Sequence, residues 1–305
     1  MSHPLSLSLS LGPPGINGAG KTTTFRMLVG DLAPSEGDAC IENISLNDMP
    51  TQFRTQIGYC PQFDALLDLL TAEETLQLFA RLRGVPKRNL DRHVTRLIRL
   101  CDLSHHATRL AYSFSGGTKR KLSVGIALTG QPRVLMLDEP TCGVDPKARR
   151  RIWLTLANGR KLQHCSLILT SHSMEECEAL CARIGIMVAG QLRCLGSIQH
   201  LRAKFGRGYS LCIKIRSRFV HDEPYLRRLQ EALLKALPSA AIKDVHQTVL
   251  DYHIADTNIG WATLFITLDK LKQDFELENY FIGDTTLEEI FIGFARQQET
   301  AKNVS

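Results

Sequence analysis

The sequence predicts an α/β protein with a mostly parallel sheet and a helical lobe, followed by a smaller α+β domain. Strand and helix patterns alternate up to about Phe205, which is typical of a parallel sheet covered on both faces. The stretch 73–129 carries helical patterns without a strand, and after Gly206 the order of elements changes. We therefore expect a first domain over 1–206, with its helical lobe at about 73–129, and a second domain over 207–305.

The first domain contains two kinds of periodic segment. Residues 5–11 alternate Leu with Ser, which predicts a half-buried strand. Apolar runs predict further strands at 57–59, 134–137, 166–170, 183–188 and 191–195. Helical spacing of apolar residues predicts helices at 21–29, 73–82, 88–100, 118–129, 147–161 and 174–180.

The second domain shows a different order. Strands are predicted at 209–216, 241–245, 248–254 and 275–282, and helices at 225–236 and 259–272. This β-α-β-β-α-β order is that of ferredoxin-like domains. A closing helix is expected from 286 to about 295. No catalytic constellation occurs here, so we expect a regulatory or interaction module.

Composition excludes several classes of protein. The net charge of +6 is mildly basic, but its two dense runs, 119–121 and 149–151, fall in predicted helices and are interpreted as solvated faces. We expect no nucleic-acid partner. The nine cysteines form no CxxC pair, which favours reduced cytosolic thiols. No stretch approaches the roughly 20 apolar residues that span a bilayer, so the chain is expected to be soluble and cytoplasmic.

A phosphate-binding loop is the first chemical motif. Residues 15–22 read GINGAGKT and match G-x-x-x-x-G-K-[ST]. Backbone N–H groups of such a loop point at phosphate oxygens, its lysine reaches the terminal phosphates and its threonine ligates Mg²⁺. The expected nucleotide-binding residues are Gly15, Asn17, Gly18, Ala19, Gly20, Lys21, Thr22 and Thr23. The motif makes the first domain a P-loop NTPase-type fold.

An acidic pair ends the apolar strand at 134–137. Parallel strands deliver their carboxyl ends to the sheet edge where α/β proteins bind ligands. Asp138 is expected to hold Mg²⁺ together with Thr22, and Glu139 to deprotonate the attacking water.

Two polar residues follow other strands of the same sheet. His172 comes just after the strand at 166–170, so it is expected near the γ-phosphate. Gln62 follows the strand at 57–59 and is expected to reach Mg²⁺ or the attacking water. Both are therefore predicted to share the catalytic edge with Glu139.

A second candidate anion site opens the helix at 118–129. Ser115, Gly116 and Gly117 stand at its N-terminus, where free N–H groups favour an anion. One domain does not need two such sites. We therefore expect this one to serve the nucleotide of a partner domain in a head-to-tail dimer, with Asp145 at the same interface.

These motifs, in this order, resemble the nucleotide-binding domain of an ATP-binding cassette transporter over about 11–205. Residues 15–24, 119–123 and 290–295 are similar to subfamily A, the lipid and sterol exporter group. The resemblance implies ATP and Mg²⁺ as ligands, ATP hydrolysis, a second cassette and transmembrane domains as partners, and a place on the cytosolic face of a membrane. It further implies the C-terminal cassette with its regulatory domain, N-terminally truncated and without the membrane part that handles the lipid.

Several positions depart from the family pattern. Only 14 residues precede Gly15, none of them aromatic, so the first strands and the adenine-stacking ring are expected to be missing. Pro13 and Pro14 enter the phosphate loop without N–H donors, and Phe114 stands where Leu is usual. The alternative function is therefore an impaired cassette that acts only in nucleotide binding or protein contacts.

Two further alternatives concern partners. The apolar stretch 63–70 lies where the family docks its membrane domain, although core packing explains it nearly as well. A soluble cassette protein that acts on ribosomes or DNA is disfavoured, because the sequence has neither a second phosphate loop nor heptads.

Overall fold

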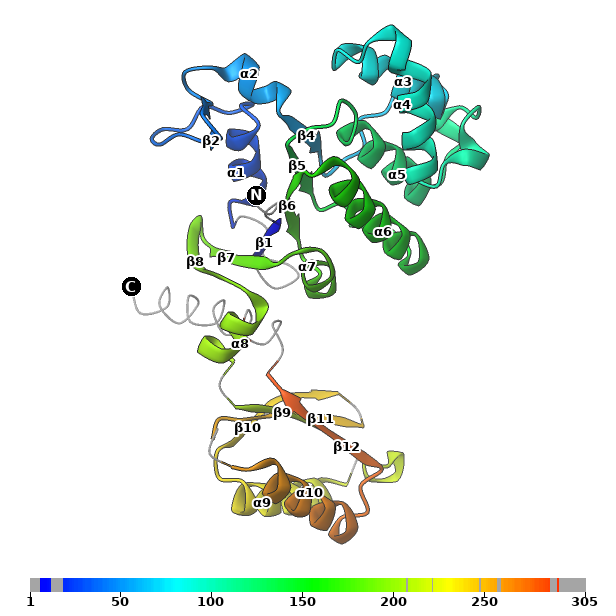
Figure 1. The fold of residues 1–305 in the computed structure, drawn as a ribbon. Coiled ribbons are helices and arrows are strands. Elements are labelled where there is room, and N and C mark those ends of the chain that lie inside the picture. The colour runs from blue at the N-terminus through cyan, green and yellow to red at the C-terminus, as the bar shows by residue number, and fades with distance from the viewer. Residues whose placement is uncertain are drawn as a thin grey trace. The chain divides into compact units, whose positions relative to one another are not determined.

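A computed structural model describes residues 6–11, 19–206, 208–220, 222–246, 248–256, 259–285 and 290. The chain forms two compact units, residues 1–198 and 199–305. Helix α8, Ile198–Phe205, lies between this division and the boundary expected near Gly206, and it was not predicted. Figure 1 shows the elements of both units.

The first unit is built on a six-stranded sheet with the order β4-β5-β6-β1-β7-β8. All neighbours pair in parallel except β7 and β8, which confirms the predicted mostly parallel sheet. The strands are β1 Ser6–Leu11, β4 Ile57–Cys60, β5 Val134–Asp138, β6 Ser166–Ser171, β7 Arg183–Val188 and β8 Gln191–Gly196.

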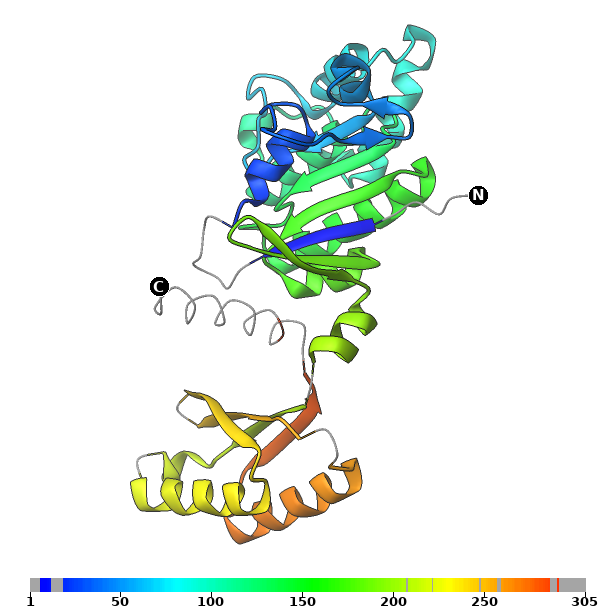
Figure 2. The ribbon, with the colours of Figure 1, turned by 90° about the vertical axis from the view of Figure 1, so that its left-hand side faces the viewer.

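Strand β1 lies in the middle of this sheet (Figure 2). Ser8 is opposite Leu169 of β6 on one side and opposite Ile184 of β7 on the other. A central parallel strand usually has a continuous apolar run, because both faces of its sheet are covered. The Leu/Ser alternation therefore predicted the strand but not its central place. Only the backbone of β1 is described.

Helices cover both faces of the sheet. Helix α1 lies on one face, and α6 and α7 lie on the other (Figure 1). Phe25 of α1 packs with Phe53, Ile57 and Met136 in a buried cluster. Asp145 caps α6 by accepting from Ala148 N. The helices are α1 Lys21–Leu28, α2 Pro50–Thr55, α6 Pro146–Gln163 and α7 Met174–Leu180, and a short hairpin is formed by β2 Cys40–Ile41 and β3 Ile44–Ser45.

Between β4 and β5 the described chain is mainly helical. Thr71 begins α3 with a capping box: its hydroxyl accepts from Glu74 N, and the Glu74 side chain accepts from Thr71 N. Ser115 caps α5. The elements are α3 Ala72–Leu82, α4 Lys87–Leu100, α5 Gly116–Ala127 and the 3₁₀ turns η1 Ser104–His106 and η2 Ala111–Ser113.

The second unit has the predicted ferredoxin-like order of elements. Its antiparallel sheet runs β10-β11-β9-β12, and α9 and α10 lie on one face (Figure 1). Buried leucines of both helices pack on the sheet. The elements are β9 Tyr209–Lys214, η3 Ser217–Phe219, α9 Glu223–Ala236, β10 Ala240–His246, β11 Val249–Ile254, α10 Trp261–Asp274 and β12 Asn279–Asp284.

The last strand of this unit begins later than predicted. Phe275 belongs to the end of α10, because its N–H donates to Leu271 O. Glu276 then takes a left-handed conformation with φ 48°, which turns the chain before Asn279 starts β12. The closing helix expected over 286–295 lies outside the described residues, apart from Ile290.

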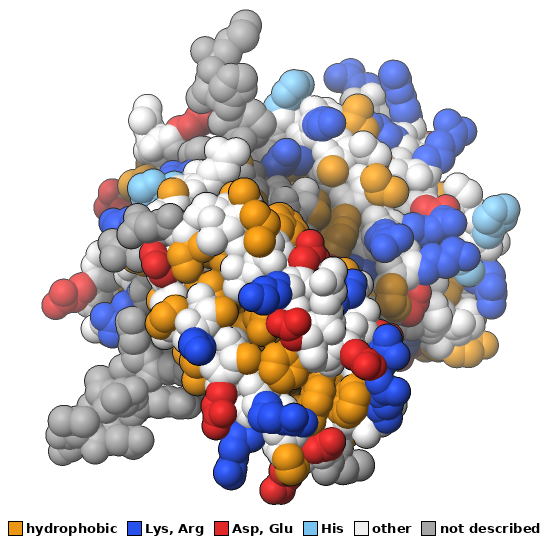
Figure 3. All heavy atoms as spheres, turned by 90° about the horizontal axis from the view of Figure 1, so that it is seen from below, with side chains coloured by type: hydrophobic (Ala, Val, Ile, Leu, Met, Phe, Trp, Pro, Cys, Tyr) orange, Lys and Arg blue, Asp and Glu red, His pale blue; other side chains and the backbone are white. Residues whose placement is uncertain are grey.

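The outer face of α9 and α10 is mixed in character. The exposed apolar residues of these two helices include Leu234, Phe265 and Ile266. Figure 3 views the molecule from the side of these helices, and apolar and charged side chains alternate over that face. This mixture is typical of a solvated helix surface.

We expect Gly58→Ala to destabilise the first unit. A Cβ at Gly58 would lie 1.9 Å from Ala127 O, so β4 and α5 would have to separate. The free energy of unfolding should fall by about 3 kcal/mol, as in overpacked cores. Urea titration followed by Trp153 fluorescence, in a Trp261→Phe background, measures the first unit alone.

Gly116→Ala is the matched control, because a Cβ there meets nothing within 4 Å. Equal urea midpoints for Gly58→Ala and Gly116→Ala would contradict this close packing of β4 on α5.

Candidate active site

Four segments distant in sequence meet at the carboxyl edge of the parallel sheet. Gln62 follows β4, Glu139 follows β5 and His172 follows β6, while Lys21 opens α1. Because these strands are parallel, their carboxyl ends share one edge. This convergence was expected from the positions of these residues after the strands, and the structure places all four side chains together.

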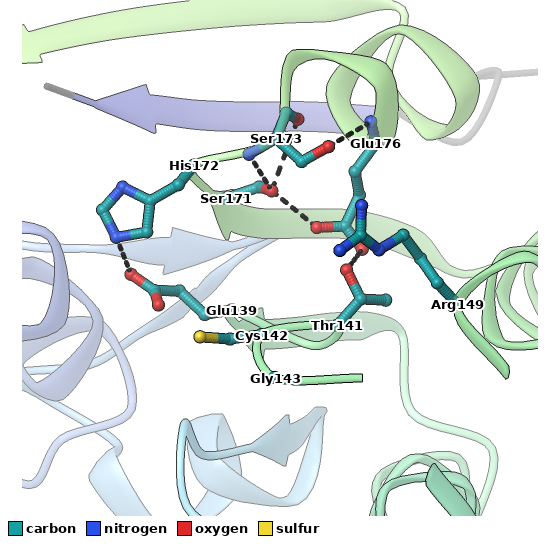
Figure 4. A pocket seen from close by; sticks show the side chains of 9 residues that line it. All are labelled: Glu139, Thr141, Cys142, Gly143, Arg149, Ser171, His172, Ser173 and Glu176. Atoms are coloured by element: carbon teal, nitrogen blue, oxygen red, sulfur yellow. Dashed lines mark hydrogen bonds and ion pairs between the residues drawn. The ribbon is translucent and has the colours of Figure 1, made fainter. Parts of the chain in front are cut away.

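Glu139 is the centre of the group. Its Oε1 accepts from Lys21 Nζ at 3.0 Å and lies 2.7 Å from His172 Nε2. Its Oε2 accepts from Gln62 Nε2 at 3.1 Å. Figure 4 shows the His172 ring directed at this carboxylate. The buried negative charge is thus paired and fully hydrogen-bonded, as burial of a charge requires.

The histidine ring links two of these groups. Lys21 Nζ lies 3.2 Å from His172 Nδ1 and 3.0 Å from Nε2, so the ammonium stands beside both ring nitrogens. Lys21, His172 and the Glu139 carboxylate are therefore in mutual contact.

The backbone of Glu139 is held in an uncommon conformation. Its φ is 47°, in the left-handed region that a glutamate seldom adopts. Its N–H donates to Thr170 O and to Thr170 Oγ1, at 3.1 and 3.0 Å. Such strain costs on the order of 1–3 kcal/mol and persists only where neighbours fix it. This turn aims the side chain along the sheet edge.

Asp138 precedes it and is almost fully buried. Its Oδ1 accepts from Thr170 Oγ1, whereas its Oδ2 has no hydrogen-bond partner among the described residues. A buried carboxylate oxygen without a donor is costly, and a cation would satisfy it. In the described ranges, no group of three or more Asp, Glu, His or Cys residues is arranged so that it could hold a metal ion. A single carboxylate fits Mg²⁺, which keeps most of its waters.

The described end of the phosphate loop sits at the start of α1. Gly20 has φ 93°, a conformation that favours glycine, and caps the helix without a side-chain bond. Ala19 O accepts from Gly190 N at 3.0 Å. Thr22 and Thr23 are exposed in the first helical turn, where free N–H groups face an anion. Gly15, Asn17 and Gly18 lie outside the described residues.

The second predicted anion site lies at a different place. Ser115 accepts from Thr118 N at the start of α5, and Asp145 accepts from Ala148 N at the start of α6. A Cβ on Gly117 would lie 2.9 Å from Ala148 Cβ, so the two helix starts adjoin. Among the described residues, the contacts of Ser115, Gly116, Gly117 and Asp145 involve neither Lys21 nor Glu139.

The interpretation of 119–121 as a solvated face is wrong for Arg120, which is 3% exposed. Its guanidinium donates to backbone oxygens around Glu139. Consecutive helical residues are about 100° apart, so three in a row cannot share one solvated face. That spacing was a signal for at least one inward cation. Thr170 was also missed, and no sequence pattern distinguishes it.

A pocket of about 250 Å³ opens beside Glu139, and Figure 4 shows its lining. Glu176 is buried there and accepts from Thr141 Oγ1, Trp153 Nε1 and Ser171 Oγ. Burial raises the pKa of the Glu176 carboxyl, although these bonds favour its charged form. Glu176 thus joins the loops that follow β5 and β6, which carry Glu139 and His172.

Two known families match the chain, one in each of its two structural units. Residues 11–142 match the ABC transporter family. Residues 206–284 match the ABCA1-like, C-terminal R1 regulatory domain.

Curated relatives match nearly the whole length of the chain. The chain is 46% identical over 284 residues to the phospholipid-transporting ATPase ABCA3 of Rattus norvegicus, covering 93% of this chain and 16% of that protein. It is 42% identical over 308 residues to the glucosylceramide transporter ABCA12 of Mus musculus, covering 97% and 12%. It is 45% identical over 284 residues to the retinal-specific phospholipid-transporting ATPase ABCA4 of Bos taurus, covering 93% and 12%. The chain therefore spans less than a fifth of these proteins.

Solved structures support the fold of the first unit. The ATP-binding subunit of an ABC transporter aligns with a TM-score of 0.59 at 27% identity, covering 67% of this chain and 82% of that one. The dimeric structure of a bacterial ABC transporter cassette aligns with a TM-score of 0.57 at 21% identity, covering 65% and 86%. The chain is thus an ABC transporter cassette joined to an ABCA1-like regulatory domain, and it belongs to subfamily A of the ATP-binding cassette transporters.

Proposed function

We propose that this chain binds ATP with Mg²⁺ and hydrolyses ATP as the nucleotide-binding part of a lipid transporter. The observation that carries the proposal is the convergence of Lys21, Gln62 and His172 on Glu139, with Asp138 directly before it. A cation, a metal-binding carboxylate and a general base at one sheet edge are the parts that phosphoryl transfer to water needs.

The phosphates are proposed to bind at the start of α1. Lys21 supplies a positive charge, and the helix N-terminus supplies free N–H groups and the positive end of its dipole. Residues 15–18 of the loop motif directly precede this helix start. The proposed phosphate site therefore combines a fixed ammonium with backbone donors.

Mg²⁺ is proposed to bind Asp138, Thr22 and Gln62. The unpartnered Asp138 Oδ2 supports this assignment. Gln62 Nε2 donates to Glu139, so its amide oxygen is the atom that would ligate. When bound, Mg²⁺ would neutralise charge on the terminal phosphates.

Glu139 is proposed as the general base. Phosphate oxygens compete with its carboxylate for Lys21 Nζ, so nucleotide binding would remove one of the two contacts of Oε1 and let it accept a proton from water. Gln62 and His172 hold the carboxylate from two directions and fix its orientation. The bonds from Glu139 N to Thr170 hold the backbone beneath it.

A partner cassette is proposed to use the second anion site. Ser115, Gly116 and Gly117 form a helix start whose contacts do not involve Glu139, with Asp145 beside it. Two such surfaces facing each other head to tail would complete two nucleotide sites. This explains why one chain carries both motifs.

Membrane-spanning partners are proposed to dock beside Gln62. Phe63 and Leu69 are each about 80% exposed, and Leu67 is half exposed. Solvent exposure of large apolar residues close together is typical of an interaction site, so the core-packing alternative does not hold for Phe63 and Leu69. None of the helices in the described ranges has the length and apolar character needed to cross a bilayer.

The relatives are named for phospholipid and glucosylceramide transport, which supports a lipid as cargo. We propose that the lipid meets only the membrane-spanning partners, and that this chain works at the cytosolic face of the membrane.

The first test is Mg-ATP binding and hydrolysis by the chain. Glu139→Gln should keep ATP binding but lower turnover by at least about 100-fold, because the general base is lost. Lys21→Ala should weaken ATP binding by about 10-fold or more, because a charge-assisted contact is lost. Calorimetry and phosphate release measure the two effects.

Glu36→Gln and Lys87→Ala are the matched controls, since both residues are exposed. Unchanged turnover in Glu139→Gln would exclude its role as base. Binding without turnover in the unmutated chain would contradict hydrolysis and favour the impaired-cassette alternative.

The second test concerns pairing of two copies of this chain. In Glu139→Gln, Mg-ATP should produce dimers in sedimentation velocity, because the nucleotide is not consumed. Adding Gly116→Asp should abolish dimers, because a carboxylate occupies a site meant for phosphate, and a Cβ there meets no atom within 4 Å.

ATP binding by the Gly116→Asp monomer is the internal control, because its own Lys21 site is intact. Dimers that persist in Gly116→Asp would contradict the head-to-tail proposal.

A further inference from the structure

Arg120 is buried in α5 and its N–H donors are all engaged. An arginine side chain has five N–H groups. Nε donates to Pro140 O (2.8 Å), Nη1 to Pro61 O (2.6 Å) and Asp64 Oδ1 (3.2 Å), and Nη2 to Asp138 O (2.8 Å) and Glu139 O (3.0 Å).

These acceptors belong to the two segments that carry the proposed catalytic side chains. Pro61 directly precedes Gln62, and the other backbone acceptors are Glu139 and its two neighbours. The side chains of Gln62 and Glu139 are themselves hydrogen-bonded at 3.1 Å. Arg120 therefore links, through their backbone oxygens, the same two segments whose side chains are hydrogen-bonded to each other.

Electrostatics explain why a cation stands here. Four carbonyl oxygens converge on the guanidinium, and without a positive charge their dipoles would repel one another. The charge is paired with Asp64, whose Oδ1 also accepts from Ser123 Oγ at 2.7 Å. A buried arginine with a carboxylate partner and a full set of acceptors meets the conditions for burying a charge.

The Glu139 backbone depends on these bonds. Its left-handed conformation is held on the N–H side by Thr170 and on the carbonyl side by Arg120. Loss of the carbonyl-side bond would let the strained turn relax toward a commoner conformation. The carboxylate would then move relative to the phosphate site.

We propose that Arg120 is a positioning residue for ATP hydrolysis: it fixes the backbones of Glu139 and Gln62 so that the general base faces the attacking water. The proposal rests on the proposed function of the site. Lys21 and the start of α1 make no contact with Arg120 among the described residues. The role therefore concerns Glu139 and the proposed Mg²⁺ ligands Gln62 and Asp138, and not the phosphate contacts of Lys21 and α1.

The test is Arg120→Lys, which keeps the positive charge but offers three donors in place of a planar fork of five. Its kcat should fall by at least about 10-fold, because small misplacements of a catalytic group are costly. Kd for ATP without Mg²⁺ should stay within about three-fold of the wild type, because the proposed phosphate contacts do not involve Arg120. A kcat within two-fold of the wild type would overturn the proposal.

Lys121→Gln is the matched control from the next residue of the helix. Lys121 pairs with Asp102 at 2.9 Å and is largely buried, but its partner lies away from both catalytic segments. Lys121→Gln should lower the free energy of unfolding without a selective loss of kcat. A similar loss of kcat in both variants would mean that Arg120 acts only through the stability of α5.

Combination with Glu139→Gln separates positioning from a general structural effect. If Arg120 acts through Glu139, adding Arg120→Lys to Glu139→Gln should lower turnover by less than about two-fold. Multiplication of the two losses would contradict the proposal.

Hydrogen exchange supplies a readout that does not need turnover. Peptides containing Gln62 and Glu139 should exchange at least about three-fold faster in Arg120→Lys than in Lys121→Gln. Absent turnover in the wild type would refute the proposed function, whereas equal exchange in the two variants would refute the positioning role.

Discussion

Parallel pairing of β1, β4, β5 and β6 is the constraint on which the candidate active site depends. Because these strands run in one direction, their carboxyl ends deliver side chains to one edge. Lys21 thereby meets Glu139, 118 positions away, and His172, 151 positions away. Antiparallel insertion of β1 would send the start of α1 to the opposite edge and separate the lysine from the carboxylate.

Two cations, the partly buried Lys21 and the buried Arg120, act on different atoms of Glu139. Lys21 bonds the carboxylate of Glu139, and Arg120 bonds its carbonyl oxygen. Each positive charge has a carboxylate partner. Arg120 pairs with Asp64, and Lys21 pairs with the Glu139 carboxylate, which His172 also contacts. The backbone is therefore held by contacts inside the protein, whereas the side chain has a partner that a phosphate can replace. This arrangement suits a general base whose backbone stays fixed while Lys21 exchanges the carboxylate for a phosphate.

Sequence patterns predicted the parallel sheet, the ferredoxin-like unit and the meeting of Lys21, Gln62, Glu139 and His172, because each depends on local periodicity or on residues just after a strand. The central place of β1 was not predictable, since its Leu/Ser alternation suggests a strand with one solvent-exposed face. The β2–β3 hairpin is too short for any period. The three consecutive cations at 119–121 indicate that one of them faces inward, but they do not indicate which backbone oxygens Arg120 binds. Thr170 acts on the backbone of another segment, and that contact leaves no pattern in the chain.

At Glu139 the left-handed backbone lowers the stability of the fold, whereas the proposed hydrolysis needs the glutamate side chain. On backbone grounds alone, Gly or Asn would suit φ 47° better than a glutamate. Selection for stability would favour Gly or Asn at position 139, and only selection for activity would retain the glutamate. A lineage that no longer needs hydrolysis should therefore lose this glutamate early, while the surrounding sheet persists. Position 139 is for this reason a sensitive indicator of whether a cassette of this fold still works as an enzyme.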